Sequence, residues 1–488
     1  MAENYFHILE IWLFSAVVGL VFWPSILLSH KQPVSMLAWL LSVTLLPVVG
    51  ALLFVLVGRD RIKRGLVRRK RASDRKVEPG LARMELQAAA PSGMPLDTLD
   101  MGENVNLKAL LHLQDRLSGP PLTWDNQVAL LQGAHKKYPR LWEDIAQAKD
   151  HVHLEYYLLK EDRTGDRLAD LLSQTVARGV KVYLLLDSLG SLMLSRSYLA
   201  GLKASGVRVS WFHPLNPLRR RWSLNLRNHR KLAIIDGRIG YLGGMNLGDE
   251  YLGERPQVDL WEDLAVRIEG SAVRSLERIF MEDWRFSTGE LPTRAAYASG
   301  VSLRPHGSMV QIMPSGPDED RDTLHRVYFG ALTTARRQAW LVTPYFLPDE
   351  SFQQALESAA LRGVDVRVLL PKRSDNRLVD FASRAVFESM LEAGVRIFLY
   401  QPGMLHAKSL LVDQSWSAVG TANLDVRSLR LNFEAGALIY DRQVAQALEG
   451  FCLRQMAQAQ EAQVTQYQHR PWWLRAAESL IRLLSPLL

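Results

Sequence analysis

Two long apolar runs open the chain, at about residues 11–28 and 36–57, and a short SHKQPVS segment joins them. Each run is close to the length of a helix that crosses a bilayer. A cleavable signal peptide is the weaker interpretation of the first run, because no basic segment precedes it and no small-residue cleavage site follows it. Residues 1–60 are therefore predicted to form a hairpin of two transmembrane helices.

A basic stretch follows the second run, GRDRIKRGLVRRKRASDRK, and a mixed segment low in aromatic residues leads on from it. We interpret residues 61–108 as a juxtamembrane segment and linker. The excess of Lys and Arg predicts that this segment, and all that follows it, lies on the cytoplasmic side of a membrane. The basic residues either lie against anionic headgroups or act only as a topology signal, and the two roles are compatible.

Beyond the linker, apolar strands alternate with amphipathic helices, and the pattern occurs twice. The stretch ARGVKVYLLLD at 177–187 resembles LRGVDVRVLLP at 361–371, and KASGVRVSWF at 203–212 resembles LEAGVRIFLY at 391–400. Alternating strands and helices predict an α/β fold with helices packed on a sheet. Two long units exclude a solenoid, so we predict tandem domains at 109–295 and 296–468, related by a pseudo-two-fold axis.

Composition narrows the choice of partners. The formal net charge of +8 and the sequence pI of about 9.4 favour anionic partners, either nucleic acid or anionic lipid. The 488 residues contain one cysteine, which excludes an intrachain disulfide and a zinc site built mainly from cysteines.

Each half carries the pattern H-x-K-x4-D, first in NHRKLAIIDG and again in LHAKSLLVDQ. The six motif residues are His229, Lys231, Asp236, His406, Lys408 and Asp413. Asn246 and Asn423 each follow 17 positions after the histidine of their copy. Since residues i and i+2 of a strand share a face, the histidine and lysine of each copy are expected to emerge together. The aspartates have the opposite parity, so within the motif we interpret them as supports for the strand end.

These residue types suit a phosphodiester. The lysines supply charge and the asparagines supply amide donors for phosphate oxygens. One neutral imidazole can attack phosphorus, while the other, protonated, donates to the leaving alcohol and later takes a proton from the acceptor. We expect no metal and no other cofactor, because the ammonium groups neutralise the charge that develops. A single copy could be a core histidine beside a snorkelling lysine, but the matched pair argues for one shared site.

A catalytic histidine needs an acceptor on its second ring nitrogen. Asp263 in LWEDLAV and Glu434 in RLNFEAG qualify, because each leads into an apolar strand, and Asp263 is preferred over the adjacent Glu262. A surface carboxylate is the alternative interpretation of either acid. Tyr157 and Tyr345 occupy matching positions in the two halves and are further candidates for substrate binding.

In two copies, H-x-K-x4-D-x6-G-[GT]-x-N resembles the signature of the phospholipase D superfamily. The longer phrases NHRKLAIIDGRIGYLGGMNLGDEY and HAKSLLVDQSWSAVGTANLDVRSLRLNFE are similar to those of membrane-anchored bacterial cardiolipin synthases. The resemblance covers nearly the whole chain. It implies two tandem phospholipase D-like α/β/α sandwich domains behind the transmembrane hairpin.

The resemblance also implies a reaction in which two phosphatidylglycerols become cardiolipin and glycerol through a covalent phosphatidyl-histidine. Carried over by motif position, His229 is the nucleophile and His406 the acid and base, while the lysines and asparagines of both copies hold the phosphate. The implied location is the bacterial inner membrane, with a multi-pass anchor and cytoplasmic catalytic domains. The implied partners are phosphatidylglycerol and other anionic lipids.

Two segments outside the motifs also suit a membrane. PLNPLRRRWSLNLRN, just before His229, carries three successive arginines at 219–221 that either meet anionic lipid or form a solvated loop. Residues 469–488 predict an amphipathic helix that either lies in the membrane interface or docks on the second domain. Its apolar face comprises Trp473, Leu474, Ala477, Leu480, Ile481 and Leu484, with Arg475, Glu478 and Arg482 elsewhere.

A hydrolase of the same superfamily, acting on phospholipid or, less favoured, on nucleic acid, is the main alternative. The basic pI keeps a nuclease open, but the apolar hairpin, the tail and the lack of interleaved aromatic and basic clusters argue against nucleic acid. A non-enzymatic membrane scaffold with a decayed site is disfavoured by the two intact motifs. Water and a lipid hydroxyl both remain open as the acceptor.

Overall fold

The computed structural model of the chain describes residues 17–18, 20–28, 33–54, 70, 105–117, 120–212, 226–253, 261–292, 307–318 and 322–482. The chain divides into two units, residues 1–69 and 70–488.

The described part of the first unit is helical. A helix over 20–27 precedes α2 (Pro33–Leu45) and α3 (Pro47–Leu53), and Pro47 at the start of α3 interrupts the second apolar run. Ile26, Val43 and Phe54 pack together in a small core. Within the residues described here, no helix has both the length and the apolar character needed to cross a membrane. The transmembrane hairpin of residues 1–60 therefore stays a prediction.

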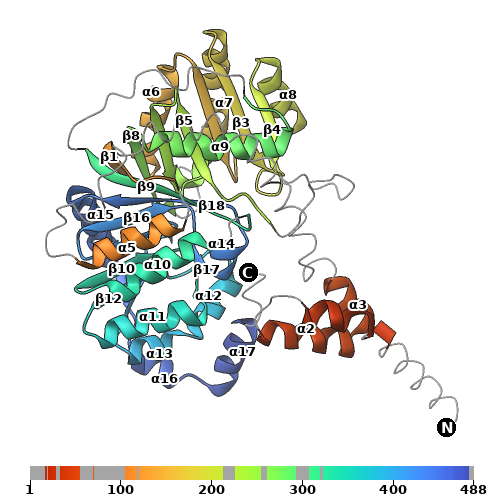
Figure 1. Cartoon of the computed structure of the whole chain (residues 1–488), viewed down its shortest axis with the longest axis vertical. Coiled ribbons are helices and arrows are strands. Elements are labelled where there is room, and N and C mark those ends of the chain that lie inside the picture. Colours follow the sequence, from red (N-terminus) through yellow and green to blue (C-terminus); the bar gives the residue numbers. More distant parts are fainter. Residues whose placement is uncertain are drawn as a thin grey trace. The chain divides into compact units, whose positions relative to one another are not determined.

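One mixed sheet runs through the second unit and joins its two halves (Figure 1). The strands of the first half are β1 (Thr123–Gln132), β2 (His151–Tyr156), β3 (Lys181–Asp187), β4 (Arg208–Phe212), β5 (Lys231–Ile235), β6 (Ile239–Gly243) and β8 (Leu264–Glu269). Those of the second half are β9 (Ser308–Ser315), β10 (Gln338–Val342), β12 (Asp365–Pro371), β13 (Arg396–Tyr400), β15 (Ser409–Val412), β16 (Trp416–Gly420), β18 (Glu434–Tyr440) and β19 (Ala459–Glu461). Two small ribbons add β7 (Trp261–Glu262) with β14 (Met404–Leu405) and β11 (Phe346–Leu347) with β17 (Leu424–Asp425).

The strand order shows the internal duplication. From the centre outward the first half reads β1-β8-β6-β5-β2-β3-β4, and the second reads β9-β18-β16-β15-β10-β12-β13-β19. The two halves meet where β1 pairs antiparallel with β9. Each strand of the first half thus has a counterpart at the same place in the second, so the predicted tandem α/β fold is present.

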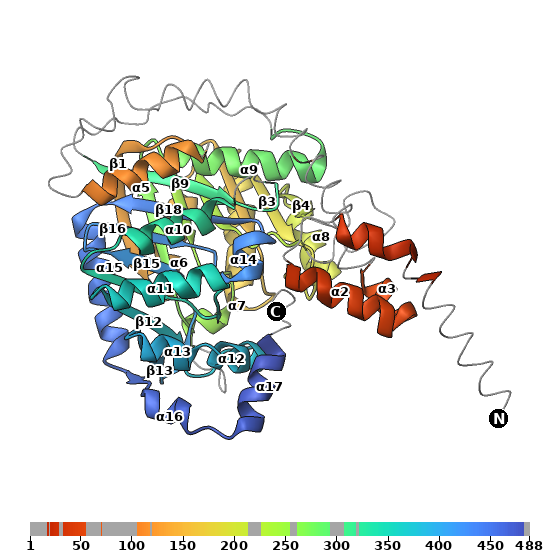
Figure 2. The same cartoon turned by 60° about the horizontal axis from the view of Figure 1, so that its bottom comes forward.

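Helices cover both faces of the sheet, as in an α/β/α sandwich (Figure 2). In the first half, Val152 and Leu154 of β2 pack with α6 (Ala134–Ala146) and α7 (Arg163–Ala177). His153, which lies between Val152 and Leu154 in the strand, points to the opposite face of the sheet and stacks on Phe280 of α9 (Val273–Thr288). The helix α8 (Arg196–Ala204) packs beside β4.

In the second half, α10 (Thr323–Thr334) and α11 (Glu350–Leu361) share a core with the strands, and α15 (Arg442–Met456) packs on the other side of the sheet. The remaining helices are short. They are α12 (Arg377–Arg384), α13 (Phe387–Glu392), α14 (Val426–Arg430), α16 (Val464–Gln468) and α17 (Trp472–Arg482), with the 3-10 turn η3 (Asp249–Leu252) in the first half.

The repeat has the same local cause in both halves. Asp162 caps α7 by accepting from Gly165 N, and Asp349 caps α11 by accepting from Phe352 N. Each helix then ends at the Arg-Gly pair in one of the two similar stretches, 177–187 and 361–371. Gly179 and Gly363 follow with φ of 89° and 87°, a backbone conformation that glycine adopts without steric cost.

Two segments near the predicted domain boundaries make contacts that the predicted division into domains does not anticipate. The helix α5 (Val105–Arg116) buries Leu110 and Leu111 in the core of the second half, although a boundary at residue 109 assigns most of it to the first domain. Lys70, in the predicted basic segment, is buried and forms salt bridges with Asp283 at 3.1 Å and Asp318 at 3.0 Å. At least this basic residue of the segment binds protein carboxylates and not lipid headgroups.

Candidate active site

The two H-x-K motifs lie at equivalent strand starts, each against the opposite half of the unit. His229 N donates to Phe433 O at 2.9 Å, and Asn228 forms an isolated parallel bridge with Phe433. By the same symmetry, His406 N donates to Glu262 O at 2.6 Å, next to the parallel pairing of β14 with β7. Each motif therefore completes its backbone hydrogen bonds across the pseudo-two-fold axis.

The histidine side chains are held crosswise as well. His229 Nδ1 lies 3.0 Å and 3.1 Å from the two carboxylate oxygens of Glu434, which opens β18 in the second half. His406 Nδ1 lies 2.7 Å from Asp263 Oδ2, just before β8 in the first half. Because each carboxylate accepts a hydrogen bond from Nδ1–H, the lone pair of each neutral histidine sits on Nε2. Both acids were predicted from the sequence, whereas the histidine that each one meets was left open.

Burial keeps both imidazoles neutral in the substrate-free site. Burial lowers the pKa of His229, with Glu434 opposing this effect and Lys231 adding to it. Burial lowers the pKa of His406 more strongly, and Lys408 adds to the effect. The charges of Lys231 and His229 also act on His406, which places both motifs at one site.

Three buried lysines surround the histidines. Lys231 Nζ donates to His229 O at 2.6 Å and lies 5.3 Å from the Tyr157 ring, and Lys408 Nζ donates to His406 O. Burial lowers the pKa of Lys231 well below its usual value and that of Lys408 to about 8. An anion entering the site would restore these pKa values, since it offsets the cost of burying the charge. The site is therefore built to receive an anion.

The third lysine was not among the predicted site residues. Lys137 of α6 donates from Nζ to Met245 O at 2.9 Å, and burial lowers its pKa to about 7 while Asp263 raises it. It lies on an ordinary amphipathic helix with no counterpart motif, so nothing in the sequence marked it.

The motif aspartates lie at the strand ends, away from the histidines. Asp236 accepts backbone hydrogen bonds from residues 149, 150 and 151, and Asp413 accepts them from 336, 337 and 338. Both aspartates have positive φ, 54° and 50°. They tie the end of β5 to β2 and the end of β15 to β10, in agreement with a structural role.

The predicted phosphate-binding asparagines are buried at the site, with part of their hydrogen bonding already used. Asn246 Nδ2 donates to Tyr251 OH at 3.2 Å, and Asn246 Oδ1 accepts from Leu158 N at 3.3 Å. Asn423 is hydrogen-bonded to Asp425. A direct role in holding phosphate stays a prediction for both amides.

The two predicted tyrosines differ in their surroundings. The Tyr157 ring meets His229 edge-on, with ring centroids 5.1 Å apart. Tyr345 OH instead donates to Asp375 Oδ1 at 2.6 Å, and the charge of Asp375 acts on His406 and Lys408.

The His406 side has aromatic neighbours that the sequence analysis missed. The Trp261 ring lies 5.0 Å from the His406 ring, and Tyr251 lies 6.0 Å away with its hydroxyl 3.5 Å from Nδ1. Tyr251 follows the first motif closely in the sequence, and Trp261 precedes Asp263 by two positions. Because the second half has no matching aromatic at these positions, the repeat gave no signal for them.

Close backbone approach explains the matched glycines of the motif. A Cβ at Gly243 would lie 2.3 Å from Leu264 O, and one at Gly420 would lie 2.6 Å from Ala435 O. A Cβ at Gly244 would lie 2.3 Å from Asp263 Oδ1. At the position matching Gly244, Thr421 donates its hydroxyl to Glu434 Oε2. The motif glycines therefore bring the supporting acids up to the histidines.

One group with metal-ligand geometry occurs among the residues that the structure describes. His151, His153 and Glu277 converge between β2 and α9, all buried. His151 Nε2 lies 3.3 Å from Glu277 Oε2, and Asp150 Oδ2 lies 3.0 Å from His151 Nδ1, so His151 is paired with a carboxylate at each ring nitrogen. Within the described part of the chain, no hydrogen bond, ion pair or ring contact joins this group to His229 or His406. The arginines at 219–221 lie outside the described residues.

A doubled α/β fold whose two H-x-K motifs bring buried histidines and lysines together at one site is the arrangement of a protein of the phospholipase D type. A family model described as "Cardiolipin synthase, PLD-like domain" matches residues 141–284 and 328–454. The chain belongs to this family.

Two relatives agree with this assignment, and one solved structure shares the fold. The chain is 37% identical over 462 residues to the cardiolipin synthase of Geobacillus thermodenitrificans, covering 94% of this chain and 90% of that protein. It is 35% identical over 466 residues to cardiolipin synthase 2 of Bacillus anthracis, covering 95% and 88%. The crystal structure of phosphatidylserine synthase from Haemophilus influenzae superposes with a TM-score of 0.60 at 17% identity, covering 78% of this chain and all of that chain, and this likeness concerns the fold alone.

Proposed function

We propose that this protein is a cardiolipin synthase that transfers a phosphatidyl group from one phosphatidylglycerol to a second, with release of glycerol. The crosswise pairing of His229 with Glu434 and of His406 with Asp263 carries this proposal. It supplies two equivalent nitrogen atoms at one anion site, which a two-step displacement at phosphorus requires. We further propose that the protein is integral to the bacterial inner membrane through residues 1–60, with its catalytic unit in the cytoplasm.

In the first step, His229 Nε2 attacks phosphorus and the bond from phosphorus to the glycerol oxygen breaks. His406, protonated once the anionic substrate has entered, gives its Nε2 proton to that oxygen, and glycerol leaves. Glu434 stabilises the positive charge that develops on the His229 ring. Lys231 and Lys408 neutralise the phosphate, and no step requires a metal or another cofactor.

In the second step, a hydroxyl of the second phosphatidylglycerol attacks the phosphorus of the phosphatidyl-histidine. His406 takes the hydroxyl proton, the P–N bond breaks, and cardiolipin is formed. One phosphodiester replaces another, so the overall exchange needs no energy source. A hydrolase would use the same residues with water as the acceptor.

The test supplies the purified full chain with phosphatidylglycerol labelled in its headgroup. We expect labelled glycerol and cardiolipin in equal amounts, whereas phosphatidic acid without cardiolipin would assign the protein as a hydrolase. His229→Ala and His406→Ala are each expected to lose at least about a thousandfold in rate while unfolding at the wild-type temperature. Substantial transfer by either variant would exclude the two-histidine scheme.

A further inference from the structure

Exposed apolar side chains stand beside the active site in the first half. In the segment that follows β3, Leu192 and Met193 are 59% and 91% exposed. The same segment packs on the backbone of Tyr157, because Ser191 Oγ donates to Tyr157 O at 3.2 Å and a Cβ at Gly190 would lie 2.1 Å from that oxygen. Since the Tyr157 ring contacts His229, this loop borders the site itself.

The second half repeats the arrangement at the matching place. The segment that follows β12 holds Asp375, which accepts from Tyr345 OH, and then begins α12 with Leu378, 48% exposed. Tyr345 is the repeat counterpart of Tyr157. Exposed apolar side chains therefore border the site from both halves, at the carboxyl ends of parallel strands.

The C-terminal helix α17 extends this surface. It docks on the domain, since Ile481 packs against Leu347 and α12, and buried Glu478 accepts from Arg470 Nη1 at 2.6 Å. Glu478 lies off the predicted apolar face of this helix and is nevertheless buried, because its pair with Arg470 offsets the cost of burying the charge. The docking leaves Trp472 and Trp473 80% and 60% exposed.

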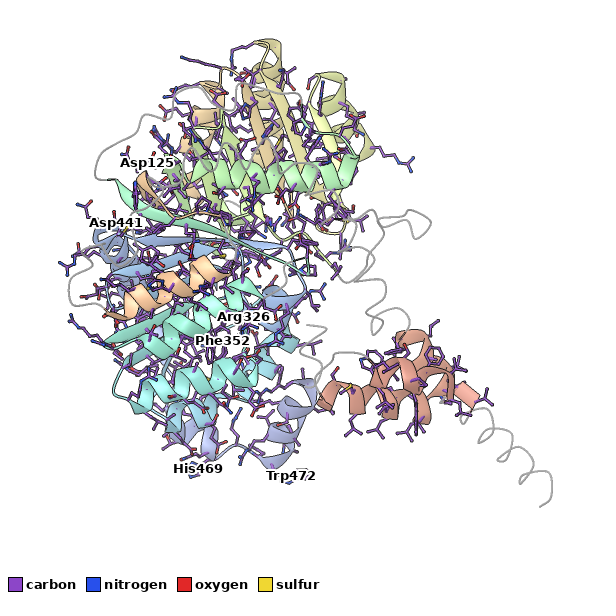
Figure 3. All side chains as sticks on the ribbon, in the orientation of Figure 1. Asp125, Arg326, Phe352, Asp441, His469 and Trp472 are labelled. Atoms are coloured by element: carbon purple, nitrogen blue, oxygen red, sulfur yellow. The ribbon has the colours of Figure 1, made fainter. Side chains whose placement is uncertain are left out.

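The helices α8, α14, α12 and α17 lie along the same side of the unit in both views (Figures 1 and 2). Figure 3 places Trp472 at the outer end of α17. We call the exposed apolar residues of this side the apolar rim. The apolar rim consists of Leu192, Met193, Leu378, Trp472, Trp473 and Leu480.

Cationic side chains are interspersed with the apolar rim. Arg196 follows the first loop, and Lys372, Arg373 and Arg377 flank Asp375 in the second, all exposed. Exposed tryptophans among basic residues are typical of proteins that bind the interfacial region of anionic bilayers. The apolar residues sit on three short, separate elements, an arrangement suited to a bilayer surface into which each can dip independently.

We infer that the apolar rim is a docking surface for an anionic lipid bilayer, which holds the mouth of the active site against the headgroups. The inference rests on the proposed function in one respect, namely that a lipid phosphodiester must reach His229 while its acyl chains stay in the bilayer. Docking in this orientation shortens that path, and it adds an attachment independent of residues 1–60.

The test places a fluorescent thiol label at chosen sites in the full chain, reconstituted in vesicles of phosphatidylglycerol and phosphatidylcholine. The native Cys452 is buried and burial raises its pKa to about 12, so it does not compete for label. Met193→Cys and Trp473→Cys are the test variants. Leu361→Cys is the matched control, because Leu361 is 74% exposed but precedes β12, at the opposite end of that strand from Leu378.

We expect brominated lipid to quench the label at positions 193 and 473 and to leave it unchanged at 361. Weaker quenching is expected in vesicles of phosphatidylcholine alone. If the labels at both 193 and 473 are not quenched, or if all three positions are quenched equally, the inference is overturned. If quenching is equal in both kinds of vesicle, the preference for anionic lipid is overturned.

A second measurement separates docking from chemistry. The double variant Leu192→Ser/Met193→Ser is expected to lose at least about tenfold in rate on phosphatidylglycerol vesicles, because two apolar side chains no longer enter the bilayer. It should match the wild type on a short-chain phosphatidylglycerol that is monomeric in water, and an equal loss on both substrates would count against docking. If the wild type forms cardiolipin from neither substrate, the proposed function fails, while the label readout still decides the docking.

Discussion

Replacing Glu434 with Gln removes one charge from the site and changes almost nothing in shape. Glu434 is completely buried, and its carboxylate oxygens lie 3.0 Å and 3.1 Å from His229 Nδ1. When His229 attacks phosphorus, its ring gains positive charge, which this carboxylate stabilises. Two unit charges about 4 Å apart at an effective dielectric constant of about 20 interact by about 4 kcal/mol, so Glu434→Gln should slow the attack by about a thousandfold.

The assay follows formation of the phosphatidyl-enzyme in a single turnover, with a donor labelled at phosphorus. The best donor is a phosphatidyl ester of nitrophenol, because nitrophenolate leaves without a proton and makes the acid dispensable. Glu434→Gln should then label slowly, whereas Asp263→Asn, which removes the carboxylate that holds His406 and leaves Glu434 against His229, should label at close to the wild-type rate. With phosphatidylglycerol as donor both variants should be slow.

Two results would refute this reasoning. If Asp263→Asn labels slowly and Glu434→Gln labels normally with the nitrophenyl donor, His406 is the nucleophile and the roles are exchanged. If both label normally, neither carboxylate supports its histidine as proposed. Thr421→Val serves as a graded control, since it removes only the hydroxyl that donates to Glu434 and should give a small loss.

Three further predictions concern the supports of the site. Asp236→Ala and Asp413→Ala should each lower the free energy of unfolding by about 2–3 kcal/mol, measured by thermal unfolding, because backbone N–H groups lose their acceptor. Asp236→Asn should cost less, since Asn keeps an acceptor and tolerates positive φ. A loss of activity without a loss of stability would contradict the structural role of these aspartates. The pH profile of kcat/KM should be bell-shaped: burial raises the pKa of Asp263 to about 6, so protonation below that pH removes its acceptor, and burial lowers the pKa of Lys408 to about 8, so its charge is lost above that pH. An alkaline limb that stays in place in Lys408→Arg would assign it to another group. Gly244→Ala should lose most transfer activity because its methyl group would displace the Asp263 carboxylate, and unchanged activity would mean that the loop shifts without cost.

The duplicated sequence determined much of the site. Three features occur twice and could be aligned without a structure: the H-x-K pattern, the asparagine that follows it, and an acid at the start of an apolar strand. The structure brings His229 to Glu434 and His406 to Asp263, as a shared site requires. Alternation of strands and helices likewise predicted the fold, since each Arg-Gly helix end and each buried strand is a local property of its own segment.

Only the tertiary structure decided the pairing. The acid that holds each histidine comes from the other half, more than a hundred residues away, and no local pattern encodes which of two equivalent partners is nearer. Residues without a repeat counterpart, such as Lys137 and Tyr251, enter the site because α6 and η3 pack there. The C-terminal helix is a further example. Its sequence predicted an amphipathic helix, but the burial of Glu478 and the exposure of Trp472 depend on how α17 packs against α12. Local periodicity follows from the chain itself, whereas partners across a duplicated fold follow from how the two copies meet.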